Sequence, residues 1–391
     1  MMELGVFVQG AGTWRSDFER ALSTQCEALE LTARLGEFHA GAPARLALFF
    51  ASEACPDVSP DAAALDAYLQ AGRVVIPVIE RPEHAPTHLP KVLSTHNAFI
   101  TSRYGDHWPE VLVDEVLSHL WLSRRVRRMF LSYLRKESAG IAHQLHEHFV
   151  RLGYDVFLDT CSVAVGADFQ RELTFRLNDA DVVLLLVSPG LERSTWVAEE
   201  VSFANGASIG VVGVLWPEAA YQRAGTRPGV TGSLERDQRH RLEDADFRGD
   251  PTHEAGRELS NDAVRAIEAM VTRYRARGIR VRLLSLLPYA TAHLSDRFIV
   301  KPGTELGALE LIAHDTLRPW KARVVPFRPT PEVLHDIYKQ ADGHPELAGA
   351  GCLYAENDPH EPRAAALKWL ANAEHAPGSY RLWPFTGKKS S

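Results

Sequence analysis

Short apolar runs alternate with amphipathic stretches along the chain, a pattern typical of parallel sheets covered by helices. Near the start, strands are predicted at 5–9, 45–51, 73–79 and 98–101, and helices at 16–35, 61–71 and 108–122. A basic run at 124–128 follows and indicates a boundary near Ser123. The first unit is therefore predicted to span 1–122.

The same alternation begins again after the basic run. Strands are predicted at 130–133, 155–158, 181–187 and 208–215, and helices at 139–152, 168–177, 194–206 and 260–277. The run at 181–187 is apolar after its first residue, so we expect it at the centre of the sheet, where both faces are buried. A polar stretch at 216–250 reads as loop, and the second unit is predicted to span 123–280.

The last part of the chain has a weaker pattern of the same kind. Strands are predicted at 281–287, 297–300 and 322–327, and helices at 306–313, 331–341 and 363–373. Pro288 is expected to terminate the first of these strands. The pattern predicts a small α/β domain at 281–391, with no indication of its role.

The sequence pattern of the first unit is similar to that of the second. With Gly72 placed on Gly206, two apolar strands and the helix between them correspond, and Asp66 faces Glu200. A duplicated fold and a chance likeness between apolar strands both explain the similarity. If the fold is duplicated, the first copy has an aspartate in place of the glutamate and has lost the neighbouring tryptophan.

Composition indicates the class of protein but gives little information about its activity. A chain of 391 residues is long enough for two or three domains. Its 45% hydrophobic and 24% charged residues are ordinary for a globular protein. A formal net charge of −7 gives no basic field of the kind that nucleic-acid binding requires. Nucleic acid is therefore an improbable partner.

Cysteine and histidine usage indicates neither a disulfide framework nor a metal site. The four cysteines are scattered without a C-x-x-C pair, which suits a reducing cytoplasm. His143 and His146 stand three residues apart with no matching third ligand. The start of the chain has no signal-peptide pattern, and no apolar run is long enough to span a bilayer. We expect a cytoplasmic protein without membrane contact or metal.

The most informative carboxylate follows the apolar strand at 181–187. Trp196 and Glu200 lie one helical turn apart on the next predicted helix. Open parallel sheets bind their ligands at the carboxyl ends of the strands, which is where this helix begins. Adjacent helical residues point about 100° apart, so Glu199 and Glu200 do not face one pocket, and Glu199 is interpreted as a solvated residue.

Five features in the same order resemble a Toll/interleukin-1 receptor (TIR) domain over about 127–277. They are the strand 130–133 with Arg135 after it, the run 152–159, the loop ending at Gly166, the strand end 186–189 and the spacing of Trp196 and Glu200. The resemblance implies a three-layer, flavodoxin-like parallel-sheet domain. It is flanked by a degenerate TIR-like α/β domain, expected to sense or assemble, and by the small C-terminal α/β domain.

TIR domains are either adaptors or enzymes that consume NAD, and by resemblance to the enzymes Glu200 is the catalytic residue. Breaking the bond between ribose and nicotinamide builds positive charge on the ribose, which a fixed carboxylate stabilises. Nicotinamide leaves as a neutral molecule, so no second acid is needed. NAD is then the substrate and no cofactor is expected. The products are nicotinamide and either ADP-ribose or a cyclic ADP-ribose.

The resemblance implies further substrate contacts around the same edge of the sheet. The residues expected to bind substrate are Tyr133, Arg135, Phe157, Asp159, Ser188 and Trp196. Arg135 is suited to the pyrophosphate, whereas a surface arginine is nearly as good an interpretation. Trp196 stacks on the ligand or packs its helix onto the sheet. Leu134 departs from the basic or polar residue usual at its position.

Three functions remain open at this point. The first is an NAD glycohydrolase that acts as a triggered effector in bacterial antiphage defence, with self-association through the 159–166 loop and an unknown activating ligand or protein. The second is a TIR scaffold in signalling, without turnover, in which Trp196 and Glu200 are structural. The third is an enzyme similar to nucleoside deoxyribosyltransferases, which use a comparable sheet edge and carboxylate.

Overall fold

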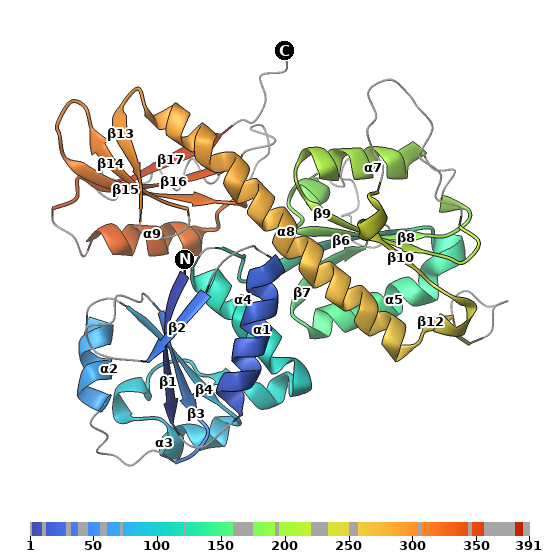
Figure 1. The fold of residues 1–391 in the computed structure, drawn as a ribbon, viewed down its shortest axis with the longest axis horizontal. Helices are drawn as coiled ribbons and strands as arrows, with labels where there is room; N and C mark the ends of the chain where they lie inside the picture. The colour runs from blue at the N-terminus through green and yellow to red at the C-terminus, as the bar shows by residue number, and fades with distance from the viewer. Residues whose placement is uncertain are drawn as a thin grey trace, which may run out of the picture.

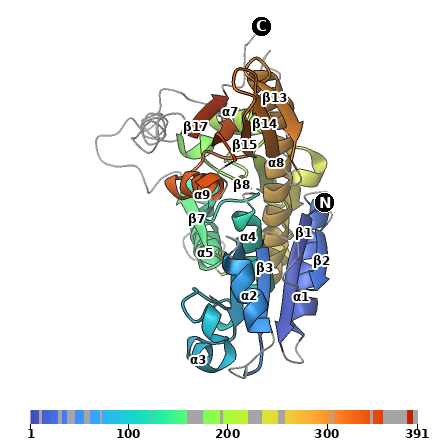
Figure 2. The same ribbon diagram turned by 90° about the vertical axis from the view of Figure 1, so that its left-hand side faces the viewer.

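The structure is a computed structural model with three five-stranded sheets in its described part, arranged around one long helix, α8 (Asn261–Leu294) (Figure 1). Figure 2 shows the same arrangement from the side, with α8 running past the first sheet toward the third. The structure describes residues 2–9, 13–28, 33–37, 46–54, 61–70, 73–120, 122–158, 175–191, 195–219, 234–249, 257–303, 307–342, 346–355 and 380–385.

The first sheet is parallel throughout, in the order β2-β1-β3-β4-β5. Its strands are β1 (Met2–Gln9), β2 (Ala33–Glu37), β3 (Leu46–Ala51), β4 (Val74–Ile79) and β5 (Phe99–Ile100). The main helices are α1 (Trp14–Ala28), α2 (Asp61–Gln70) and α4 (Trp108–His119); shorter ones are η1 (Pro82–His84), α3 (Ala85–His88), η2 (Lys91–Leu93), η3 (Thr101–Arg103) and η4 (Gly105–His107). Four of these strands are confirmed predictions. β2 lies at the end of the helix predicted at 16–35, because pairing with β1 overrides the local helix preference.

The second sheet is also parallel, in the order β10-β9-β8-β6-β7. Its strands are β6 (Arg127–Tyr133), β7 (Tyr154–Leu158), β8 (Val182–Val187), β9 (Gly210–Leu215) and β10 (Arg239–Arg241). With α5 (Arg135–Arg151) and α7 (Thr195–Gly206) come η6 (Arg236–Gln238), η7 (Asp244–Asp246) and the hairpin β11 (Phe247–Arg248) with β12 (Glu258–Leu259). Every residue of β8 is buried and the strand is central, as predicted.

Two details of the second unit differ from the sequence prediction. α5 begins at Arg135, directly after β6, so no loop extends over 134–138. β10 lies in a stretch read as loop, because three residues of polar sequence give no strand signal. α5 and α8 cover one face of the sheet and α7 the other, which makes the three-layer α/β domain that the sequence predicted (Figure 1).

The two parallel sheets have the same topology. Read from β2 to β5 and from β7 to β10, the strands follow each other in the same order along the chain. β3 and β4 match β8 and β9 at a single offset in numbering, with Leu46 on Val182 and Val74 on Gly210. This strand register differs by two residues from the one inferred from sequence, whereas the helices between the strands, α2 and α7, begin at Asp61 and Thr195 and keep Asp66 opposite Glu200. The shared topology supports a duplicated fold.

The third sheet is mixed, in the order β13-β14-β15-β16-β17. Its strands are β13 (Phe298–Pro302), β14 (Ala308–Ala313), β15 (Pro319–Val325), β16 (Gly349–Ala355) and β17 (Tyr380–Phe385), and α9 (Pro331–Asp342) lies between β15 and β16 in sequence. The first three strands pair antiparallel and the last three parallel. The helix predicted at 306–313 is wrong, because Leu309, Leu311 and Ala313 are buried alternately along β14. The helix predicted at 363–373 lies outside the described residues.

The strand predicted at 281–287 is also wrong, since this segment belongs to α8. Pro288 lies inside the helix, which continues to Leu294. Leu283 and Leu286 are buried one turn apart, a helical and not a strand periodicity. The predicted boundary at 280–281 therefore falls within a continuous helix.

One hydrophobic core runs from the first unit through α8 into the third sheet. Leu283 and Leu286 of α8 share it with Phe18 of α1, Leu112 of α4 and Leu309 of β14. The N-terminal half of α8 belongs instead to the core of the second sheet, where Ile267 and Val271 are fully buried. α8 thus completes two cores at once.

α8 approaches β9 closely enough to require glycine on both sides. A Cβ at Gly278 would lie 2.7 Å from the Gly210 nitrogen, and one at Gly210 would lie 2.2 Å from the Tyr274 carbonyl oxygen. Both neighbours are backbone atoms and have little freedom to move. The helix and the strand are therefore in backbone contact at this point.

Gly278→Ala tests this contact because two effects have opposite sign. Helix propensity alone would stabilise the variant by about 1 kcal/mol. The clash with β9 is expected to outweigh it and lower the free energy of unfolding by about 1–3 kcal/mol. Gly206→Ala, in α7, is the control, since a Cβ there meets nothing within 4 Å. Denaturant unfolding in which Gly278→Ala matched or exceeded the wild type would contradict the close approach.

Candidate functional site

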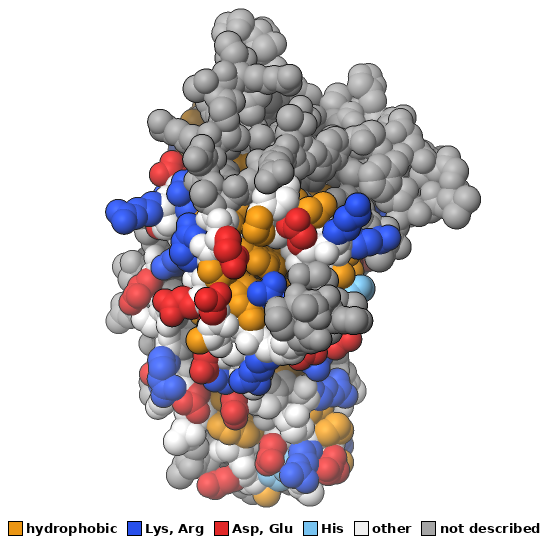
Figure 3. Space-filling model, turned by 90° about the vertical axis from the view of Figure 1, so that its right-hand side faces the viewer, with side chains coloured by type: hydrophobic (Ala, Val, Ile, Leu, Met, Phe, Trp, Pro, Cys, Tyr) orange, Lys and Arg blue, Asp and Glu red, His pale blue; other side chains and the backbone are white. Residues whose placement is uncertain are grey.

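The carboxyl ends of β6 and β8 lie side by side, with Tyr133 paired to Leu186. α5 begins two residues beyond β6, and α7 follows β8 after a short turn. This edge lies on the right-hand side of the second unit in Figure 1, away from the other two sheets. Figure 3, which looks onto that side, shows apolar side chains gathered between acidic and basic ones.

Glu137 ties the two strand ends together. Its carboxylate accepts a hydrogen bond from the Gly190 backbone N–H at 2.8 Å. A Cβ at Gly190 would lie 2.3 Å from Glu137 Oε1 and 2.8 Å from Leu134 Cδ2, so the turn is packed tightly on both side chains. Leu134, which departs from the usual residue in the resemblance, therefore has a packing role here. Glu137 was missed from the sequence, where 134–138 is interpreted as a polar loop ahead of the helix.

Two hydroxyl groups at this edge are buried without a hydrogen-bond partner among the described residues. They belong to Ser188, at the end of β8, and Ser138, in the first turn of α5. Buried polar groups normally have a partner, and leaving one unpaired costs free energy. Both hydroxyls are suited to bond a polar group that enters the edge.

Tyr133 and Phe157 are buried side chains and do not form part of an exposed binding surface. Tyr133 is 4% exposed and Phe157 is 6% exposed. The Phe157 ring stacks on Phe130 with 5.4 Å between centroids, and the Arg176 guanidinium carbon lies 5.3 Å from the Phe157 centroid. Arg135, by contrast, is exposed as the first residue of α5.

Trp196 and Glu200 both lie on α7, as its second and sixth residues. Their side chains, like all of Asp159 and the 159–166 loop, lie outside the described residues. The positions can still be compared on the helix, because Val201 and Ala204 are fully buried and mark the face toward the sheet. At about 100° per residue, position 199 is nearly opposite this face, whereas position 200 is about 70° from it. Position 200 is therefore on the flank of the helix.

A family model for the TIR domain matches residues 129–259. This is a TIR domain protein. The matched range begins within β6 and ends at β12, so it covers the second sheet except for the first two residues of β6. The TIR domain accordingly includes Tyr133, Ser188 and the helix that carries Glu200.

Two further comparisons add little to this assignment. No curated protein matches the chain. Among solved structures it is similar to an ABC transporter substrate-binding protein from Sphaerobacter thermophilus, at 12% identity over 81% of this chain and 95% of that one, with a TM-score of 0.16. A likeness this weak carries no argument about fold or function.

Neither a metal cluster nor a membrane span is found in the part of the TIR domain protein that the structure describes. No three side chains of His, Cys, Asp or Glu gather there in a way that could hold a metal ion. Among the described helices, α8 included, none is both long and apolar enough to cross a bilayer.

Glu137→Ala is expected to loosen the turn before α7. The variant leaves the partly buried Gly190 N–H without its acceptor, so the free energy of unfolding should fall by about 1 kcal/mol. Lys136→Ala is the matched control, because Lys136 is exposed on the same turn of α5. Equal unfolding midpoints for the two variants would show that the Glu137 contact does not hold this edge.

Proposed function

We propose that the TIR domain cleaves the bond between nicotinamide and ribose in NAD, with Glu200 as the catalytic residue. The observation that carries the proposal is the position of Glu200 in a TIR domain, on the helix that follows the central strand β8. Ligands of open parallel sheets bind beyond the carboxyl ends of such strands. Position 199 is nearly opposite the buried face of α7, whereas position 200 is on its flank, which favours Glu200 over Glu199.

The proposed reaction needs one carboxylate. As the bond between ribose C1′ and the nicotinamide nitrogen breaks, its electron pair leaves with nicotinamide, which departs as a neutral molecule. The ribose becomes oxocarbenium-like, and an adjacent carboxylate stabilises that charge. Water then bonds to C1′ and loses a proton to give ADP-ribose. Alternatively, an adenine nitrogen of the same molecule bonds to C1′ and gives a cyclic ADP-ribose.

The described residues of the edge offer contacts for the rest of NAD. Arg135 is exposed directly after β6, where its guanidinium suits the pyrophosphate. The hydroxyls of Ser188 and Ser138 suit the ribose or the carboxamide. Trp196 precedes Glu200 by one turn of α7, and an aromatic side chain there suits the nicotinamide ring. NAD is consumed in this scheme, so no resident cofactor is required.

The first unit supports the idea of a regulated effector. It has the topology of the TIR domain, but α2 contains no tryptophan and carries the shorter Asp66 as the sixth residue, the place that Glu200 has in α7. TIR domains commonly self-associate. A catalytic TIR domain beside a degenerate copy fits an effector in antiphage defence that an unidentified ligand or protein triggers.

Nicotinamide release from NAD tests the proposal, measured with the full chain over a range of protein concentrations. Glu200→Gln keeps the size of the side chain and removes its charge, so turnover should fall by about 100-fold or more. Glu199→Gln is the matched control and should keep turnover within a few-fold of the wild type. A rise in specific activity with protein concentration would indicate that assembly activates the enzyme.

Two results would count against the proposal. One is wild-type protein that binds NAD or self-associates but releases no nicotinamide at any concentration, which is the behaviour of a scaffold. The other is a Glu200→Gln variant as active as Glu199→Gln. Cleavage of deoxyribonucleosides in preference to NAD would point instead to base exchange.

A further inference from the structure

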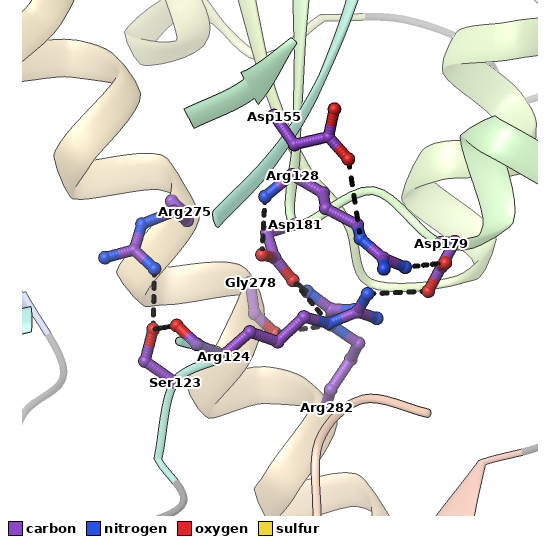
Figure 4. A network of polar contacts seen from close by, with 9 residues as sticks. All are labelled: Ser123, Arg124, Arg128, Asp155, Asp179, Asp181, Arg275, Gly278 and Arg282. Atoms are coloured by element: carbon purple, nitrogen blue, oxygen red, sulfur yellow. Dashed lines mark hydrogen bonds and ion pairs between the residues drawn. The ribbon is translucent and has the colours of Figure 1, made fainter. Parts of the chain in front are cut away.

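A buried cluster of charged side chains lies at the amino edge of the TIR sheet, opposite the candidate active site, and Figure 4 shows part of it. We call this cluster the arginine junction. Its members come from α4, the segment before β6, β6, the segment before β8, and α8: Asp114, Arg124, Arg127, Asp179, Asp181, Arg275 and Arg282. The third sheet's unit reaches the junction through Phe327, whose ring centroid lies 5.4 Å from Arg124 Cζ.

Most members of the junction are paired closely. Asp114 binds both Arg275 and Arg127, the latter with Nη2 to Oδ2 at 2.9 Å. Arg275 also donates to the Ser123 hydroxyl at 2.8 Å. Arg124 donates to Asp179 at 2.6 Å. Asp179 also binds Arg128, so Asp114 and Asp179 each bind two arginines.

Arg282 has no dedicated partner. It shares Asp181 with Arg124, and its Nη2 lies 3.9 Å from Asp181 Oδ1, whereas Arg124 Nε lies at 3.4 Å. Among the described residues, its Nε donates to the Gly278 carbonyl oxygen, at 3.5 Å. Within the described residues, Nη2 of Arg282 and Nε of Arg124 are buried without a hydrogen bond. Two guanidinium groups thus converge on one carboxylate and keep free donors beside it.

The charges of the junction do not balance. Its four arginines, each with a side chain no more than 10% exposed, face three buried aspartates, so one positive charge is in excess. Arg128 and the exposed Asp155 add one charge of each sign at the rim. Burial lowers the pKa of Arg282 to about 10, an effect that Asp181 opposes and that Arg124 and Arg275 reinforce. Arg282 therefore remains charged at neutral pH, and a buried charge without a counter-ion is costly.

We infer that the arginine junction binds a small oxyanion, a phosphate or the phosphate group of a larger molecule, through the free donors of Arg282 and Arg124. A guanidinium presents parallel N–H groups that match two oxygens of a phosphate. One such anion supplies the missing negative charge and the missing acceptors together. Because the junction joins α4 of the first unit, the TIR sheet and α8, and contacts Phe327 of the third unit, anion binding also strengthens their association. This inference is independent of the chemistry proposed for Glu200.

Thermal unfolding of the full chain with inorganic phosphate tests the inference, with chloride at equal ionic strength as the reference. Phosphate should raise the unfolding temperature in a saturable manner, because a ligand that binds the folded state stabilises it. Arg282→Met should abolish that response. Arg282→Lys, which keeps the charge without the planar fork, should raise the apparent dissociation constant roughly tenfold or more. Arg277→Met is the control on the same helix, since Arg277 is 60% exposed, and it should respond as the wild type does.

Two outcomes overturn the inference. The first is a wild type that phosphate stabilises no more than chloride does. The second is a phosphate response that persists in both Arg282 variants, which would place the anion elsewhere. If Arg282→Met does not fold, the affinity of Arg282→Lys decides the question alone.

Discussion

The packing of α8 is the constraint on which the rest of the structure depends. Its N-terminal half completes the core of the TIR sheet, and its C-terminal half completes a core shared by the first unit and the third sheet. The contact of Gly278 with Gly210 fixes how closely the helix lies on β9. The three sheets are therefore not independent domains joined by flexible linkers, because separating any of them from α8 exposes a buried apolar surface.

Buried ion pairs fix the same arrangement of the first unit, the TIR sheet and α8. Asp114, on a helix of the first unit, binds Arg127 of β6 and Arg275 of α8. Moving the first unit away would leave two buried arginines without their counter-ion, a change that costs several kcal/mol. β6 and β8 run from this junction to the candidate active site, from Arg127 to Tyr133 and from Val182 to Val187. The junction and the site thus lie at opposite ends of the same two strands.

Much of the fold could be predicted from the sequence, but the side-chain pairing could not. β8 was predicted as central because an uninterrupted apolar run has to be buried on both faces. β14 and the segment 281–287 were misassigned because short apolar runs suit a strand or a helix equally until the neighbouring element is known. Glu137 and Arg282 gave no usable signal, since their partners lie far away in the sequence or on another element.

The central claim is that substrate binds at the carboxyl edge of the TIR sheet, and hydrogen exchange tests it most directly. The measurement compares backbone amide exchange with and without an NAD analogue whose glycosidic bond cannot be cleaved. Slower exchange at 134–138, at Gly190 and along α7, with no change at the exposed turn of Leu317, is the expected result. Protection confined to other elements, or none at a saturating concentration of the analogue, would contradict the account.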